Sequence, residues 1–168
     1  MDNLNIVGEI FGFVAVILGF IAFQMNSTKK LLMLQITICL CFSIQYLLLG
    51  AYPAMAMNII GIIRNIVYSY KRIFSSKWIP YLFAIVMGIF GVISWTGWYS
   101  IFVIVGLMIN TVGLSFKNPQ NIRISTLIAY PLCTIYDSFE FAIAAIVYDL
   151  AVMISSFIGI LRAKKVKI

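Results

Sequence analysis

Long apolar runs separated by short polar segments cover almost the whole chain of 168 residues. Each run is about long enough to cross the apolar layer of a bilayer as a helix. With 63% hydrophobic and 10% charged residues, the chain lacks the polar surface that a water-soluble domain of this length needs. The sequence therefore predicts an all-α integral membrane protein with seven transmembrane helices, near residues 7–25, 31–50, 52–70, 79–95, 98–116, 123–137 and 140–161.

The charged residues are divided between the two ends of these predicted helices. All twelve Lys and Arg residues lie on or toward one face, whereas the five acidic residues lie at the other face or inside the membrane. An odd number of helices preserves this asymmetry, because one helix more or fewer would scatter the basic loops over both faces. By the positive-inside rule, we expect the N-terminus outside and the C-terminus in the cytoplasm.

Composition also excludes several classes of function. The chain has no histidine, so metal sites and proton transfer based on imidazole are excluded. It has no phosphate-binding loop and no nucleophile elbow, so we expect no enzyme activity, no cofactor and no metal. The basic residues behind the net charge of +7 lie in short loops beside apolar runs. In that position they interact with lipid headgroups, so nucleic acid is not an expected partner. The expected partners are the lipid bilayer and a small polar solute, and a homo-oligomer is left open.

The second and third predicted helices reappear as the sixth and seventh. Phe42 precedes Asn58 by sixteen positions. Cys133 precedes Asp149 by the same spacing. If three helices are followed by a single fourth helix and then by three more, both triplets begin on the same face of the membrane. This arrangement predicts 3+1+3 parallel triple-helix repeats. The chain would then divide into a first triple-helix repeat at 1–71, a linker helix at 72–97, and a second triple-helix repeat with a basic cytoplasmic tail at 98–168.

This plan resembles that of the SWEET and SemiSWEET sugar transporters and the wider PQ-loop family. Within that group the chain is most similar to the YgjV family of bacterial inner-membrane proteins. The resemblance implies a multi-pass protein of the cell inner (plasma) membrane. It is carried by Phe23-Gln24, Ser27 through Gln35, Tyr46 through Tyr52, and Asn58 through Asn65.

In SWEET-like transporters, a proline-glutamine pair in the first helix supports rocking, and an aromatic residue lies sixteen positions before an asparagine that touches the substrate. The resemblance places Gln24 at the hinge, although the residue before it is not proline. It places Phe42 and Asn58 at the aromatic and asparagine positions, and Cys133 and Asp149 at the matching positions of the second repeat. It thus implies alternating access around a midplane pocket for a small polar solute of unknown identity.

Asp149 is the strongest single candidate for a functional residue. A carboxylate near the bilayer centre is costly and usually faces a protein interior or a wet cavity, so it could bind a cationic group, carry a proton or join two helices. Asn58 offers a donor and an acceptor to a hydroxyl-bearing ligand, or joins helices. The candidate residues are Asn58, Asp149, Phe42, Cys133 and Asn110 for substrate binding, and Gln24, Tyr46, Tyr136 and Pro131 for gating or as hinges.

Other ionisable residues have expected places as well. Arg64 would extend to the lipid headgroups or pair with a buried carboxylate. Asp137 and Glu140 frame a short loop and would be solvated, and Glu9 would line an external vestibule. Two further functions stay open: a non-transporting membrane subunit or scaffold, and a facilitator for a vitamin-like or cationic metabolite, which a carboxylate in the pocket favours.

Overall fold

The computed structural model describes residues 3–23, 28–70, 78–116 and 118–165, and within them the chain is almost entirely helical. Helices occur in each of the seven predicted places, which confirms the prediction of an all-α chain. They are α1 (Asn3–Phe23), α2 (Thr28–Leu49), α3 (Tyr52–Ser69), α5 (Ile79–Ile93), α6 (Ser100–Gly113), α7 (Pro119–Phe139) and α8 (Ile143–Lys165).

The start of α7 differs most clearly from the prediction, because the helix begins at Pro119 and not near residue 123. The side chain of Asn118 accepts a hydrogen bond from the backbone N–H of Gln120 at 2.9 Å, which caps the helix. Proline is well suited to the first helical position, where no N–H is needed. The polar segment before the apolar run is therefore the first turn of α7.

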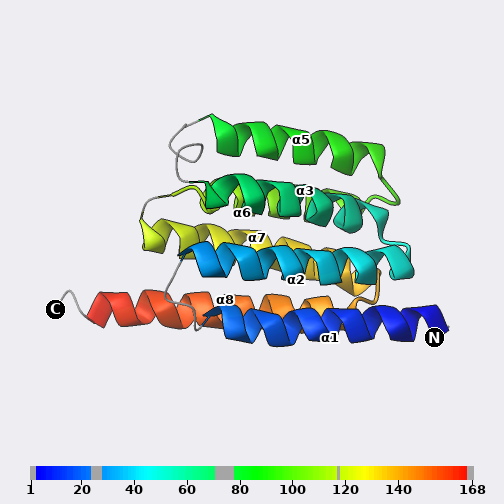
Figure 1. Cartoon of the computed structure of the whole chain (residues 1–168), viewed down its shortest axis with the longest axis horizontal. Helices are drawn as coiled ribbons and strands as arrows, with labels where there is room; N and C mark the ends of the chain where they lie inside the picture. The colour runs from blue at the N-terminus through cyan, green and yellow to red at the C-terminus, as the bar shows by residue number, and fades with distance from the viewer. Residues whose placement is uncertain (1–2, 24–27, 71–77, 117, 166–168) are drawn as a thin grey trace.

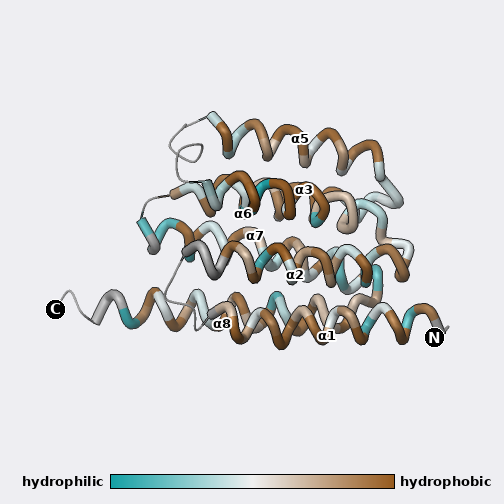
Figure 2. Tube along the Cα trace, in the orientation of Figure 1, coloured by the Kyte–Doolittle hydropathy of each residue, from teal (hydrophilic) through white to brown (hydrophobic). Residues whose placement is uncertain are grey.

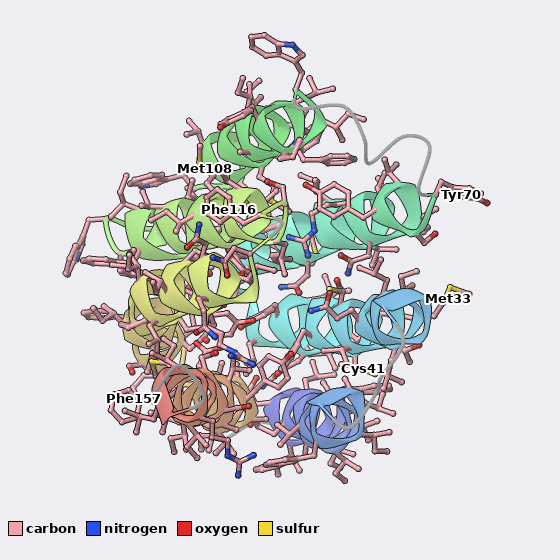
Figure 3. The ribbon with its side chains drawn as sticks, turned by 90° about the vertical axis from the view of Figure 1, so that its left-hand side faces the viewer. Met33, Cys41, Tyr70, Met108, Phe116 and Phe157 are labelled. Carbon is pink, nitrogen blue, oxygen red and sulfur yellow. The ribbon has the colours of Figure 1, made fainter. Side chains whose placement is uncertain are left out.

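The helices run alternately in opposite directions and form two rows (Figures 1 and 3). One row holds α1, α2 and α3, and the other holds α8, α7 and α6. The rows meet where α1 packs against α8 and where α3 packs against α6. Helix α5 packs against α3 and α6 at one end of the two rows. The middle helices α2 and α7 therefore face each other across the centre of the molecule.

Figure 2 shows that hydrophobic residues predominate along α1 and α5. Large aliphatic and aromatic side chains are exposed on α1, α5 and α8. Within the described residues, three stretches are long and apolar enough to cross a membrane: Leu4–Ala22, Leu32–Leu49 and Ile143–Arg162. Helices α5 and α6 are apolar but shorter. Since water would not favour so much exposed apolar surface, the exterior suits a lipid environment.

The α2–α3 and α7–α8 connections share one backbone geometry. Gly50 has a φ of 75°, and Phe141, 91 positions later, has a φ of 54°. Each is followed by an alanine whose N–H donates to the carbonyl five residues earlier, at 2.8 Å and 3.0 Å. Glycine adopts a positive φ freely, whereas phenylalanine does so at an energetic cost. The second connection thus keeps a turn for which its own sequence is poorly suited.

Helix α1 approaches α2 and α8 closely along its glycine face. A Cβ atom on Gly12 would overlap the Gln45 side-chain amide and would lie 2.6 Å from the Cβ of Ala144. A Cβ on Gly8 would lie 3.3 Å from the Gln45 carbonyl oxygen. Small residues at this spacing allow the helix backbones to come together.

Glu9 lies on the same face of α1 and is buried, with an exposed fraction of 7%. Its carboxylate accepts hydrogen bonds from the backbone N–H groups of Ile143 and Ala144 at 3.1 and 2.8 Å, and from Gln45 Nε2 at 3.0 Å. These two N–H groups belong to the first turn of α8 and have no partner inside that helix. Glu9 therefore caps α8 from another helix, and the prediction of an external vestibule role is wrong.

Candidate functional site

A polar cavity of about 80 Å³ lies between the two rows of helices. Side chains from α2, α3, α6, α7 and α8 line it, together with Met87 from α5. This volume has room for about six water-sized groups. The structure brings all five residues proposed for substrate binding to this one cavity: Phe42, Asn58, Asn110, Cys133 and Asp149.

Two carboxyl groups meet at the cavity wall. Asp137 and Asp149 are 1% and 5% exposed, and both line the cavity. Asp149 Oδ2 also accepts a hydrogen bond from Thr134 Oγ1 at 3.2 Å. Helices α7 and α8 thus each contribute one buried carboxyl group to the cavity wall.

The Asp137 carboxylate also joins the two rows of helices. Tyr46 on α2 donates its hydroxyl to Asp137 Oδ1 at 2.8 Å, and both residues line the cavity. The prediction that Asp137 is solvated is wrong, because its side chain lies in the interior at the last turn of α7. The sequence did contain a signal for this contact: Tyr46 and Asp137 are 91 positions apart, the same separation as Asn58 and Asp149.

Glu140 and Tyr136 lie next to the cavity and not in its wall. Tyr136 is fully buried and packs against Tyr99, with ring centroids 5.8 Å apart. Burial raises the pKa of the half-buried Glu140 carboxyl, and the nearby Tyr136 and Tyr99 hydroxyls oppose that rise. The prediction that Glu140 is fully solvated is therefore wrong. Tyr136 belongs to an aromatic cluster at the end of the bundle where α7 ends and α6 begins.

Arg64 lies on the α3 side of the cavity and is 4% exposed. Its Nη1 donates to Thr111 Oγ1 of α6 at 2.8 Å, and its Nε and Nη2 both donate to Asn65 Oδ1 at 3.1 Å. The prediction that Arg64 extends to the headgroups is wrong, because these contacts hold its guanidinium in the interior. Both partners are uncharged, so the alternative of a contact with a carboxylate is not realised either.

Aromatic rings form another part of the wall. Phe42 packs edge-on against Tyr148, with centroids 5.0 Å apart and an interplanar angle of 71°. Tyr148 in turn contacts Tyr130 at a centroid distance of 6.4 Å. Sequence reasoning selected Phe42 but missed both tyrosines. Tyr130 lies three positions before Cys133, on the same face of α7, so a search of that face would have found it. Tyr148 is adjacent to Asp149 and does not share its face, so the same search would have missed it.

Amide side chains complete the lining. Asn58 Nδ2 donates to the Ala54 carbonyl of its own helix at 2.9 Å, and among the described residues it forms no hydrogen bond to another helix. Gln35 Oε1 is buried at the cavity wall, and it has no hydrogen-bond partner in the described part of the chain. The cavity therefore presents a free acceptor to whatever enters it.

The residues proposed for gating are placed differently from one another. Tyr46 lines the cavity and links the two rows, whereas Tyr136 lies beyond the wall. Pro131 lies inside α7 on an exposed face. Gln24 lies outside the described residues. Over the described ranges, no group of three or more Cys, Asp or Glu side chains is arranged to hold a metal ion.

Comparison with known proteins gives one match. The model of the family Imp-YgjV, described as bacterial inner membrane protein, matches residues 6–167. No curated protein and no solved structure matches the chain.

Proposed function

The chain belongs to the Imp-YgjV family of bacterial inner membrane proteins, and from this premise we propose that it transports a small polar solute by alternating access around the cavity. The observation that carries this proposal is the cavity between the two helix rows, which is lined from six helices and contains the side chains of Arg64, Asp137 and Asp149. Ionisable groups inside a membrane protein are costly and usually serve a solute or proton path. A protein that only packs against partners has no need of them.

We propose that the moving units are two parallel repeats, α1–α3 and α6–α8, with α5 as the linker. The order of neighbours within the two rows supports this, as do the matching turns at Gly50 and Phe141. Tyr46 and Asp137 would occupy equivalent positions, and they contact each other directly. Equivalent residues meet in this way only beside a symmetry axis, which here would lie along the membrane normal.

In the proposed topology all seven helices cross the membrane, with the N-terminus outside. The last residues of α1, α3, α6 and α8 lie at one end of the bundle (Figure 1). In the sequence, the basic stretches follow these helix ends. Trp78 and Trp95 flank α5 and are exposed, as expected of anchors at the two interfaces. The positive-inside rule then places the basic end in the cytoplasm.

The scaffold alternative and the transport proposal predict different responses at Asn58. Purified protein would be reconstituted in liposomes loaded with labelled small metabolites, including amino acids, polyols, amines and organic acids. We expect release of at least one of them, and we expect Asn58→Ala to slow that release by about tenfold, the effect of removing roughly 1.4 kcal/mol of binding. Asn121→Ala serves as the control, because Asn121 is exposed on the first turn of α7. If no metabolite is released faster than from liposomes without the protein, the scaffold alternative is favoured.

A further inference from the structure

The cavity contains a buried positive charge whose hydrogen-bond partners are uncharged. Arg64 contacts only the neutral oxygens of Asn65 and Thr111 among the described residues. The Thr111 hydroxyl donates to Met87 Sδ at 3.1 Å, so its oxygen is turned toward the guanidinium as an acceptor. A buried charge with no opposite charge in contact is strongly unfavourable. The site is therefore electrically incomplete around Arg64.

The guanidinium also retains donors for a ligand. It has five N–H groups, of which three donate to Asn65 and Thr111. One N–H on Nη1 and one on Nη2 have no partner in the described part of the chain. A carboxylate binds such a pair of donors through its two oxygens. Arg64 is thus suited to an anionic group of modest size.

The same cavity also contains two carboxyl side chains that are not in contact with Arg64. Asp137 and Asp149 both line it, and neither forms an ion pair with Arg64 in the described part of the chain. Arg64 and Asp149 both line the cavity, and Tyr130 lies within electrostatic reach of both. Two opposite charges that only neutralised each other would be more stable in direct contact. Here each faces the cavity without that contact.

We infer that the solute is a small zwitterion whose carboxylate binds Arg64 and whose ammonium group binds the Asp137–Asp149 pair. This inference rests on the proposed transport function and names its substrate class. The volume of about 80 Å³ suits a solute of about six heavy atoms, such as glycine or alanine. The unpartnered Gln35 Oε1 offers a further acceptor for an N–H donor of the solute.

Binding of labelled glycine to the purified protein tests this inference, with glycolate, ethanolamine and glycerol as competitors. Glycolate lacks the ammonium group, ethanolamine lacks the carboxylate, and glycerol lacks both. We expect glycine to compete at least about tenfold better than each of the three, since each lacks at least one charged contact. Equal competition by glycerol would overturn the zwitterion, while release of glycerol from liposomes would still support transport. Glycine binding without flux of any solute would support the zwitterion-binding site and contradict the proposed transport function.

Two substitutions separate the ends of the site. Arg64→Gln should weaken the binding of glycine and glycolate by about tenfold or more and leave the binding of ethanolamine unchanged. Asp149→Asn should weaken the binding of glycine and ethanolamine and leave the binding of glycolate unchanged. Arg162→Gln is the matched control, because Arg162 is exposed near the end of α8 and away from the cavity. If Arg64→Gln does not fold, Arg64→Lys should retain weakened glycolate binding. Equal losses for all probes in each variant would mean a structural role only and would overturn the inference.

Discussion

Asp149→Asn is expected to lower solute flux by at least about tenfold and to change its dependence on pH. In the wild type, Tyr46 donates a hydrogen bond to Asp137, and Thr134 donates one to Asp149. An amide at position 149 cannot bind and release a proton, so Asp137 would be the one carboxyl group of the pair that still titrates. Flux into proteoliposomes measured from an external pH of about 5 to 8 would reveal the change.

The folded state should survive this substitution. Asparagine is close to aspartate in shape and is less costly to bury, so the melting temperature should be unchanged or slightly higher. Glu140→Gln is the control, because Glu140 is half-buried outside the cavity wall and its loss should leave the pH profile of flux intact. Identical rates and identical pH profiles for the wild type and Asp149→Asn would remove Asp149 from the mechanism.

Gly12→Val is expected to lower the melting temperature of the purified protein by about 3–10 °C, as for an overpacked core site. Any Cβ at position 12 would overlap the Gln45 amide and press on Ala144. The Gln45 side chain is not free to move away, because it is fully buried and donates to Glu9. The same displacement would therefore also disturb the cap of α8 that Glu9 supplies.

Gly88→Ala provides the contrast for this prediction. A Cβ at Gly88 would meet only the flexible Met108 side chain, at 3.2 Å from Sδ. Alanine also has the higher helix propensity, so this variant should melt at the same temperature or slightly higher. Melting would be followed by size-exclusion chromatography of heated samples in detergent. Equal melting temperatures for the two variants would show that the α1 glycine face is not close-packed.

The helices themselves were predictable because hydrophobicity is a local property of the chain. Each apolar run specifies its own helix, and Asn118 and Pro119 mark the start of α7 by local capping chemistry. The gathering of Phe42, Asn58 and Asp149 at one cavity was also foreseen, through a spacing that recurs along the chain. Spacing works here because residues at matching positions of similar helices face in matching directions.

The polar contacts were not predictable in the same way, since their partners are distant in sequence. Glu9 was predicted to line an external vestibule, but its partners Ile143 and Ala144 lie more than 130 positions later. Arg64 looked like a headgroup anchor, and only the packing of α3 on α6 brings Thr111 to it. Burial of a charge depends on which helices are neighbours, and no local pattern records that.

The most direct test of alternating access uses the native cysteines. Cys133 lines the cavity, whereas Cys41 belongs to the apolar core and does not line it. Cys41 lies on α2 (Figure 3). Variants that keep only one of these cysteines would be treated with a small membrane-impermeant methanethiosulfonate, in right-side-out and in inside-out vesicles. The reagent needs a thiolate in contact with water, so it reports which face opens to the cavity. We expect Cys133 to react from both sides and Cys41 from neither, whereas reaction of Cys133 from one side only, or from neither, would contradict alternating access.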